Sequence, residues 1–376
     1  MSINRLETEV HMNINFIDLR AQYLTIKDEI DQAIRAVIEK TAFAAGPFVK
    51  SFEEKFAERH EAKYCVGVNS GTSALHIAMW ALGIGPGDEV IVPTNTFFAT
   101  AEAVSLCGAT PVFVDCEPRY FNIDPHKIEE AITPKTRAVI PVHLYGQAAR
   151  MEEIQSVAAK HGLIVIEDCA QAHLTEYKGK KVGTFGTCGC FSFYPGKNLG
   201  AYGEGGAVMT NDESLFKKMM ALRDHGSTRK YYHDYVGHNY RMEGIQGAVL
   251  EVKLKHLEDW TQKRRRNADL YRKYLHGIRQ VEAPQEMPGG RHVYHLFVVK
   301  VERRAELINY LKNEGIATGM HYPIPCHLQK AYAYLPLRTP LPIAEKLAND
   351  ILSLPMYAEL SEEEIRYICK KIEAFF

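Results

Sequence analysis

One lysine in the sequence stands where a reactive amine is favoured. Lys197 follows an apolar run, Cys190–Phe193, and a Pro-Gly turn, and it precedes a glycine-rich segment that leads into a second apolar run, 206–210. Most lysines are solvated at the surface, but a turn between two core strands is a poor place for one. Burial lowers the pKa of an amine, and a neutral amine can form a Schiff base with an aldehyde. Lys197 is therefore a candidate nucleophile.

A carboxylate follows another apolar run. Asp168 comes directly after LIVIE, residues 163–167, which reads as a buried strand. Ligands of open parallel sheets bind beyond the carboxyl ends of the strands. An acid there would keep the ring nitrogen of pyridoxal phosphate protonated, so that the ring accepts electrons. A metal ligand or a helix cap is the alternative for Asp168, and Gln171 lies within reach of a neighbouring oxygen.

Two further strand ends carry candidate binding residues. The segment Ser70-Gly71-Thr72-Ser73 lies between a strand and a helix, and a helix N-terminus with a glycine suits a phosphate. A plain N-cap made by Thr72 or Ser73 is the alternative. Phe97 follows the strand EVIVP, so its ring could stack on a cofactor, although core packing is the commoner fate of phenylalanine.

The elements that position these residues alternate between strand and helix. After helices at 18–38 and 48–59, strands are expected at 64–68, 89–92, 110–114, 138–142, 163–167, 190–193 and 206–210, with helices between them. Unbroken apolar strands joined by helices indicate an α/β fold with a mostly parallel sheet covered on both faces. Beyond residue 260 a charged helix, strands at 295–301 and 318–322, and helices at 304–314, 343–351 and 362–374 indicate a smaller α+β domain. We therefore divide the chain into residues 1–260 and 261–376.

Composition excludes several classes of protein. The formal net charge of -1 gives no global basic field for nucleic acid, and the one dense basic run, Lys263-Arg264-Arg265-Arg266, reads as a solvated helix face. The eight cysteines match no zinc spacing, so no metal is expected, and as reduced core residues they indicate a cytoplasmic protein. The N-terminal segment, 1–16, is too polar for a signal peptide, and no run is long and apolar enough to span a membrane.

The chain resembles the DegT/DnrJ/EryC1/StrS family of sugar aminotransferases from Phe16 to its C-terminus. The resemblance rests on six blocks that follow the order of the family. They are NSGTSALHIAM (69–79), GDEVIVPTNTFFATAEAV (87–104), IEDCAQAH (166–173), FSFYPGKNLGAYGEGGAV (191–208), NYRMEGIQGAVL (239–250) and HYPIPCHLQKAY (321–332). It implies the aspartate-aminotransferase fold, fold type I, with a large domain that binds pyridoxal phosphate and a small C-terminal domain.

The resemblance also implies roles for single residues. Lys197 would form the Schiff base and shuttle the proton, Asp168 would pair with the pyridine nitrogen, and Gln171 would lie near the phenolic oxygen. Phe97 would stack on the ring. Gly71, Thr72, Ser192 and, more weakly, Ser73 would bind the phosphate. Asn239 would reach the phosphate of the neighbouring subunit, which implies a homodimer with shared active sites.

The implied reaction moves an amino group from an amino acid, expected to be glutamate, to a nucleotide-linked keto-sugar. The block 321–332 is similar to family members that act at C3 of dTDP-linked 3-keto-6-deoxyhexoses, while a UDP carrier and C4 chemistry stay open. Candidates for the sugar and diphosphate are Arg229, Lys230, Tyr231, His321, Tyr322 and His327, for which packing or solvation is the alternative. Leu174 stands where the family commonly has glycine.

Two rival functions remain at this level. Some family members are called regulatory proteins, which would keep the fold without catalysis, but no helix-turn-helix pattern occurs in this sequence. Others are dehydratases that hold a histidine in place of the lysine, and Lys197 argues against that chemistry. The sequence thus predicts a transaminase.

Overall fold

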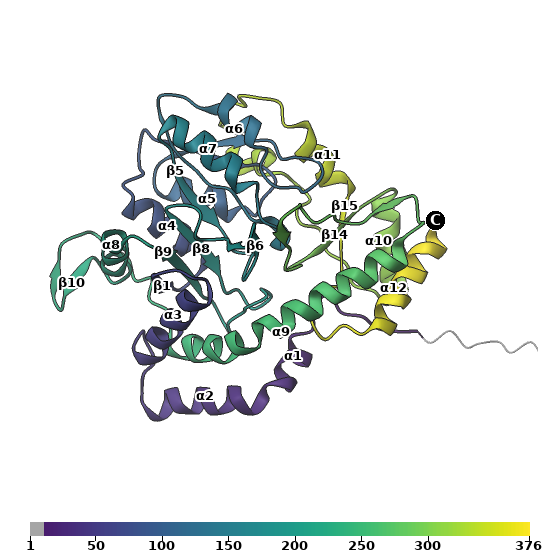
Figure 1. Cartoon of the computed structure of the whole chain (residues 1–376), viewed down its shortest axis with the longest axis horizontal. Helices are drawn as coiled ribbons and strands as arrows, with labels where there is room; N and C mark the ends of the chain where they lie inside the picture. The colour runs from purple at the N-terminus through teal and green to yellow at the C-terminus, as the bar shows by residue number, and fades with distance from the viewer. Residues whose placement is uncertain (1–10) are drawn as a thin grey trace, which may run out of the picture.

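The computed structural model describes residues 11–376, so the predicted lack of a signal peptide falls largely outside the described residues. Its centre is a seven-stranded sheet of order β1-β9-β8-β5-β4-β2-β3 (Figure 1). Strand β9 runs antiparallel to β1 and β8, and the other adjacent pairs are parallel. The strands are β1 (Tyr64–Val68), β2 (Glu89–Pro93), β3 (Thr110–Val114), β4 (Thr136–Val139), β5 (Ile164–Asp168), β8 (Cys188–Ser192) and β9 (Gly206–Thr210).

Helices cover both faces of this sheet. Helices α4, α5 and α8 share one apolar cluster with the sheet, and α3, α6, α7 and part of α9 share another. Their bounds are α3 (Pro47–Arg59), α4 (Gly71–Ala81), α5 (Ala99–Leu106), α6 (Pro125–Ala131), α7 (Met151–His161), α8 (Glu213–Arg223) and α9 (Gly244–Leu275). The predicted α/β architecture is confirmed, because every strand of the sheet is apolar enough to be buried on two sides.

The N-terminal helix differs from the prediction of one helix over 18–38. Helix α1 (Leu19–Thr25) and helix α2 (Lys27–Glu39) are separate, and Ile26 between them has a non-helical conformation. The amide of Ile26 bonds back to the carbonyl of Tyr23, which tightens the last turn of α1 and ends it. The apolar periodicity continues across the break, so the pattern alone did not reveal it.

The C-terminal part is an α+β unit around a sheet of order β12-β14-β15. Its elements are β12 (Val281–Glu282), β14 (Phe297–Val301), α10 (Arg304–Asn313), α11 (Pro342–Asp350), β15 (Ile351–Leu354) and α12 (Glu362–Phe375). The strand predicted at 318–322 is wrong. Only Gly319 pairs there, with Ser353, and the two prolines that follow at 323 and 325 have no amide to extend a ladder. Strand β15 was missed.

Helix α9 crosses the predicted domain boundary at 260 without a break. In Figure 1 it runs diagonally beneath the sheet towards the C-terminal unit. Its basic run is only partly a solvated face, because Lys263 and Arg266 are exposed while Arg264 is buried. Arg264 is 3% exposed, and its guanidinium donates to the carbonyls of Tyr294, His295 and Met356. Arg264 thereby ties the C-terminal unit to α9, and the division at 260 stays a prediction.

Short elements complete the fold. Strands β6 (Glu176–Tyr177), β7 (Lys180–Lys181) and β13 (Gly290–Arg291) form a small sheet, and β10 (Ser227–Arg229) and β11 (Tyr232–His233) form a hairpin that projects from the body beyond α8 (Figure 1). The 3₁₀ turns are η1 (Leu144–Gly146), η2 (Cys326–Leu328) and η3 (Lys330–Tyr332).

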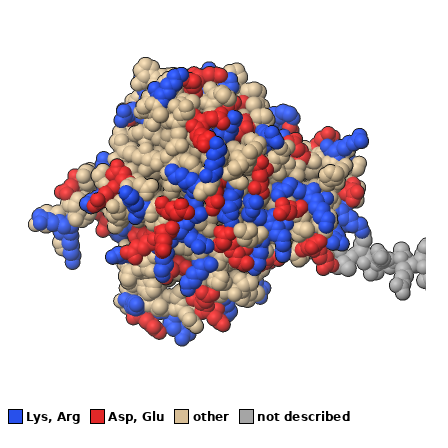
Figure 2. Space-filling model, in the orientation of Figure 1, with Lys and Arg blue, Asp and Glu red and all other residues tan. Residues whose placement is uncertain are grey.

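Surface and thiol chemistry agree with the composition. Acidic and basic side chains are interspersed over the face drawn in Figure 2. All eight cysteines are free thiols, and seven of them are buried. Within residues 11–376, no helix combines the length and apolar character that crossing a bilayer requires.

Candidate active site

The candidate residues gather at one edge of the sheet. Strands β1, β2, β5 and β8 end near Ser70, Phe97, Asp168 and Ser192, and Lys197 lies in the loop that follows β8. Backbone bonds hold this loop closed, since the amide of Lys197 donates to the carbonyl of Tyr194 and the amide of Ala201 donates to that of Phe193. Parallel strands have their carboxyl ends at the same edge of the sheet, so segments that are distant in the sequence meet there.

Lys197 and Asp168 interact through their charges. Burial lowers the pKa of the Lys197 amine to about 8, and the Asp168 carboxylate opposes that shift. Part of the lysine surface stays open, yet the surrounding protein desolvates its ammonium group. Burial also raises the pKa of Asp168, which is 4% exposed. The site thus holds an amine that is partly neutral near pH 8 opposite a carboxylate shielded from water.

Neighbouring donors stabilise the Asp168 carboxylate. The amide of Ala170 donates to Oδ1 at 3.0 Å, and the hydroxyl of Thr100 donates to Oδ2 at 2.8 Å. Thr100 in turn lies 2.9 Å from the hydroxyl of Thr96. These bonds act against the effect of burial on the pKa of Asp168. The sequence analysis missed Thr100, which lies in the first turn of helix α5 and not at a strand end.

Gln171 is fixed by residues from two other segments. Its Oε1 accepts from the amide of Tyr145 at 2.7 Å, and its Nε2 donates to the hydroxyl of Tyr322 at 3.0 Å. The hydroxyl of Tyr145 donates to the carbonyl of His321. One amide hydrogen of Gln171 therefore remains for a ligand. Tyr145 was missed, although it follows β4 and the strand-end rule would have found it.

The start of α4 forms a close cradle with β8. The hydroxyl of Ser70 accepts from the amide of Ser73, so the cap is Ser70 and not Thr72 or Ser73. The amides of Gly71 and Thr72 have no intrahelical acceptor. A Cβ added to Gly71 would lie 2.6 Å from that of Ser192. Only glycine lets the helix end approach the serine this closely, which suits an anion held between them.

Phe97 presents its ring at the same edge. It is 56% exposed, and its ring centroid lies 5.6 Å from that of Tyr322.

His321 hydrogen-bonds Ser353 through Nδ1 at 2.9 Å, and burial lowers the pKa of its imidazole to about 4. His321 and Tyr322 thus lie beside the Lys197 site, as a substrate-facing role requires.

The structure does not bring all substrate candidates to this place. His327 offers no free ring nitrogen, because both of its ring nitrogens have protein partners, Thr94 and Glu345. Arg229, Lys230 and Tyr231 lie in the projecting β10–β11 hairpin, and Tyr231 is 82% exposed. The Arg229 guanidinium lies over the ring of Tyr232, and Asn239, which is exposed, pairs its backbone with Asp224.

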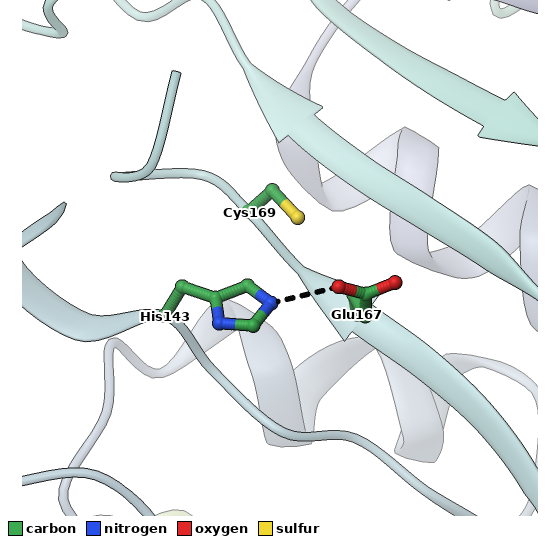
Figure 3. A group of neighbouring side chains, drawn as sticks. All are labelled: His143, Glu167 and Cys169. Atoms are coloured by element: carbon green, nitrogen blue, oxygen red, sulfur yellow. Dashed lines mark hydrogen bonds and ion pairs between the residues drawn. The ribbon is translucent and has the colours of Figure 1, made fainter. Parts of the chain in front are cut away.

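A second buried polar group includes Glu167 of strand β5 (Figure 3). The imidazole of His143 faces Glu167 at 3.0 Å, and Cys169 lies beside them. The amide of Ala149 donates to His143 Nδ1, so Nε2 carries the proton and donates to Glu167. Backbone amides of residues 183 and 186 occupy the remaining carboxylate positions. Both ring nitrogens of His143 and both carboxylate oxygens of Glu167 thus have partners within the protein, which is typical of a structural cluster.

The comparisons agree with this geometry. The model of the DegT/DnrJ/EryC1/StrS aminotransferase family matches residues 24–373. The chain belongs to this family. A pleiotropic regulatory protein of Geobacillus stearothermophilus is 47% identical, over 97% of this chain and 99% of its own length. The UDP-N-acetyl-3-dehydro-alpha-D-glucosamine 3-aminotransferase of Acidithiobacillus ferrooxidans is 46% identical, over 96% and 97%.

Further family members give the same result. The dTDP-3-amino-3,4,6-trideoxy-alpha-D-glucose transaminase of Streptomyces venezuelae is 45% identical, with 93% of both chains covered. The crystal structure of S. venezuelae DesV in complex with a ketimine intermediate superposes with a TM-score of 0.94 at 43% identity, covering 96% of this chain and 98% of that one. The predicted enzyme class, an aminotransferase, and the predicted fold are confirmed.

One departure from the pattern that the resemblance implied has an unusual backbone conformation. Leu174, where the resemblance implied glycine, has φ 63°. That conformation is left-handed, and glycine adopts it without strain. The side chain of Leu174 is 2% exposed, so apolar burial offsets the cost of the backbone conformation.

Proposed function

We propose that this chain is a pyridoxal-phosphate-dependent aminotransferase that transfers the amino group of an amino acid to C3 of a nucleotide-linked keto-sugar. Glutamate is the proposed donor. In the overall exchange the donor becomes a 2-keto acid and the sugar ketone becomes an amine, so no further oxidant or reductant is needed. The observation that carries the proposal is the half-buried, desolvated amine of Lys197, whose charge interacts with the buried carboxylate of Asp168.

The residues at the sheet edge fit this cofactor. The Gly71–Ser192 cradle, with Thr72 and Ser73, would hold its phosphate, and Asp168 would pair with its ring nitrogen. Phe97 would stack on the ring. Gln171 has one free amide hydrogen for the phenolic oxygen. The cofactor, when bound, supplies an electron sink and carries the amino group between donor and acceptor.

The protein's own part in the chemistry is proton transfer and exclusion of water. An amine with a pKa of about 8 is a base and an acid of useful strength near neutral pH, so Lys197 can take a proton from the donor and return it at the sugar carbon. The hydrogen bonds that Thr100 and Ala170 donate to Asp168 favour its charged form and oppose the effect of burial on its pKa. Tyr322 and Phe97 cover the site from the side of the C-terminal unit.

The choice of C3 rests on the relatives. The A. ferrooxidans enzyme is named for a UDP-linked 3-dehydro sugar, and the S. venezuelae enzyme for a dTDP-linked 3-amino sugar. Both names place the amino group on C3 and differ in the nucleotide. We therefore propose that the amino group is transferred to C3. The first substrate to assay is a dTDP-linked 3-keto-6-deoxyhexose, and a UDP-linked 3-keto sugar is the second.

The direct experiment uses the purified protein with pyridoxal phosphate, glutamate and a panel of dTDP- and UDP-linked 3-keto and 4-keto sugars. We expect glutamate to abolish the visible absorbance band of the bound cofactor, and a 3-keto sugar to be aminated with release of 2-oxoglutarate. Lys197→Ala should lose both responses, whereas Lys180→Ala, at an exposed position, should keep them. Full turnover by Lys197→Ala would contradict the assignment.

We also propose a homodimer in which Asn239 and the β10–β11 hairpin of one subunit complete the site of the other. The hairpin projects from the body, and its arginine, lysine and tyrosine side chains at 229–231 are exposed. Such groups can bind the diphosphate of a nucleotide sugar that lies in the active site of the neighbouring subunit. A second copy would also bury the large exposed tyrosines of this hairpin.

Subunit complementation tests this arrangement. Lys197→Ala and Asn239→Asp chains, each inactive alone, are co-expressed with different tags. If each site takes Lys197 from one subunit and Asn239 from the other, about one quarter of the sites are intact in the mixture. Activity no greater than that of the separate variants would mean that each site is built from one chain.

A regulatory protein without catalysis is the second candidate, because the relative from G. stearothermophilus bears that name. It predicts no response of the cofactor band to glutamate. The complete set of polar groups around Lys197 argues for catalysis, since a binding protein has no need of a desolvated amine.

A further inference from the structure

The segment 321–328 connects the C-terminal unit to the end of strand β2. At its far end, the amide of Cys326 donates to the carbonyl of Thr94 at 3.0 Å, and the Cys326 thiol lies 3.5 Å from the carbonyl of Thr96. The next residue, His327, places Nδ1 at 2.7 Å from the hydroxyl of Thr94 and its amide at 3.3 Å from the same oxygen. This end of the segment is therefore attached to β2 at several points.

His327 uses both ring nitrogens in these contacts. Its Nε2 lies 3.2 Å from the carboxylate of Glu345 on α11, and its side chain is 3% exposed. A carboxylate only accepts, so Nε2 carries a proton. The Thr94 oxygen accepts from the His327 amide and also hydrogen-bonds Nδ1. Both ring nitrogens thus have protein partners, and no ring nitrogen is left for a sugar.

The near end of the segment reaches the candidate active site. The hydroxyl of Tyr322 accepts from Gln171 at 3.0 Å, and its ring packs against Phe97. Between Tyr322 and His327 lie two prolines, at 323 and 325, whose fixed φ angles make the link stiff. A displacement at His327 is therefore transmitted to Tyr322, and from there to the amide plane of Gln171.

We propose that Thr94, His327 and Glu345 form a clamp that positions Tyr322 and Gln171 for the keto-sugar and the cofactor. His327 is then a positioning residue and not a sugar ligand. The proposal rests on the proposed function for its kinetic consequence, but the clamp itself is a property of the protein. It joins α11 and the segment 321–328 to Thr94, the residue that follows strand β2 and is distant from both in the chain.

Thr94 offers a matched pair of variants. Thr94→Val keeps the shape and removes the hydroxyl, and Thr94→Ser keeps the hydroxyl. In the holoenzyme we expect Thr94→Val to speed hydrogen exchange of peptides covering 321–328 by about tenfold and to raise KM for the keto-sugar by a similar factor, because misplacement of a site residue is costly. The pH titration of the bound cofactor's visible band should shift as well. Thr94→Ser should behave as wild type.

Two further variants keep the test decisive. Glu345→Ala removes the outer partner of His327 at an exposed helical position and should repeat the effects of Thr94→Val if that variant folds poorly. Ser105→Ala removes the neighbouring bond to Tyr332, outside the clamp, and should change neither readout.

The outcomes separate the two proposals. Unchanged exchange in 321–328 and unchanged KM in both Thr94→Val and Glu345→Ala would overturn the clamp, and so would a loss of thermal stability alone, with KM and the cofactor titration at wild-type values. If the wild-type protein aminates no sugar of the panel, the proposed function fails. Hydrogen exchange of the segment 321–328 and the pH titration of the cofactor band then test the clamp without any measurement of turnover.

Discussion

The hydroxyl of Thr100 donates a hydrogen bond of 2.8 Å to Oδ2 of Asp168. It connects helix α5 to the end of strand β5, and it is one of two bonds that favour the ionised carboxylate in a buried place. Thr100 lies within the block 87–104 but was not singled out as a site residue, and its hydrogen bond favours the ionised form of the predicted catalytic acid.

Thr100→Val should raise the pKa of Asp168 further, because the variant removes one of the hydrogen bonds that lower this pKa against the effect of burial. The loss of a donor to a charged group corresponds to about 1.5–3 kcal/mol, or roughly ten- to a hundredfold in activity. The acid limb of the pH profile of kcat/KM should move to higher pH. Thr100→Ser, which keeps the hydroxyl, serves as the control, and equal profiles for both variants would contradict the role of this bond.

Lys197→Met should stabilise the apoprotein at pH 7. The folded pKa of Lys197, about 8, lies below its ordinary value of 10.5, so the unfolded chain binds more protons between these values and wild-type stability rises with pH across that window. The variant lacks this slope. Its advantage should be at most about 3 kcal/mol below pH 8, since the lysine keeps some solvation, and should vanish above pH 10.5. Urea unfolding of both apoproteins at several pH values measures it, and a constant difference would refute the shift.

The same pKa has a kinetic consequence. The rate at which the apoprotein captures pyridoxal phosphate should rise with pH and level off above about 8, because only the neutral amine attacks an aldehyde. Stopped-flow absorbance follows this reaction without any sugar. A midpoint near 10.5, the ordinary value for a lysine, would place Lys197 in water.

Arg264→Ala should destabilise the protein by about 3 kcal/mol or more, since three carbonyls lose their donor inside the protein. Differential scanning fluorimetry should show a loss of several degrees in Tm. Arg266→Ala, at the exposed position two residues later, should have little effect. Equal stability of the two variants would support the solvated helix face that the basic run suggested.

Arg223→Met tests a buried ion pair beneath strand β1. The guanidinium of Arg223 bonds Glu53 at 2.5 Å and the carbonyl of Gly67 at 2.9 Å. Burial already raises the pKa of Glu53, and removal of its partner leaves that carboxylate uncompensated. We expect a loss of about 3–5 kcal/mol in the free energy of unfolding. The double variant Glu53→Leu/Arg223→Met should recover part of it, and no recovery would show that packing, not charge, dominates.

Much of the fold could be predicted from sequence because its signals are local. Apolar runs of strand length and their spacing gave strands β1, β3 and β9 with the bounds that the structure has. The break at Ile26 and strand β15 escaped prediction. The break at Ile26 leaves the apolar periodicity intact, so the pattern does not show it. Strand β15 follows helix α11 directly and is too short to have a recognisable pattern of its own.

The sequence by itself determined which reactive side chains stand at the ends of strands, since Lys197 and Asp168 are recognised by the segments around them. The tertiary structure decided how those side chains are held. Thr94 and His327 are 233 residues apart, and no local pattern shows that they touch. Their contact depends on how the C-terminal unit meets the sheet, which only long-range packing and hydrogen bonding establish.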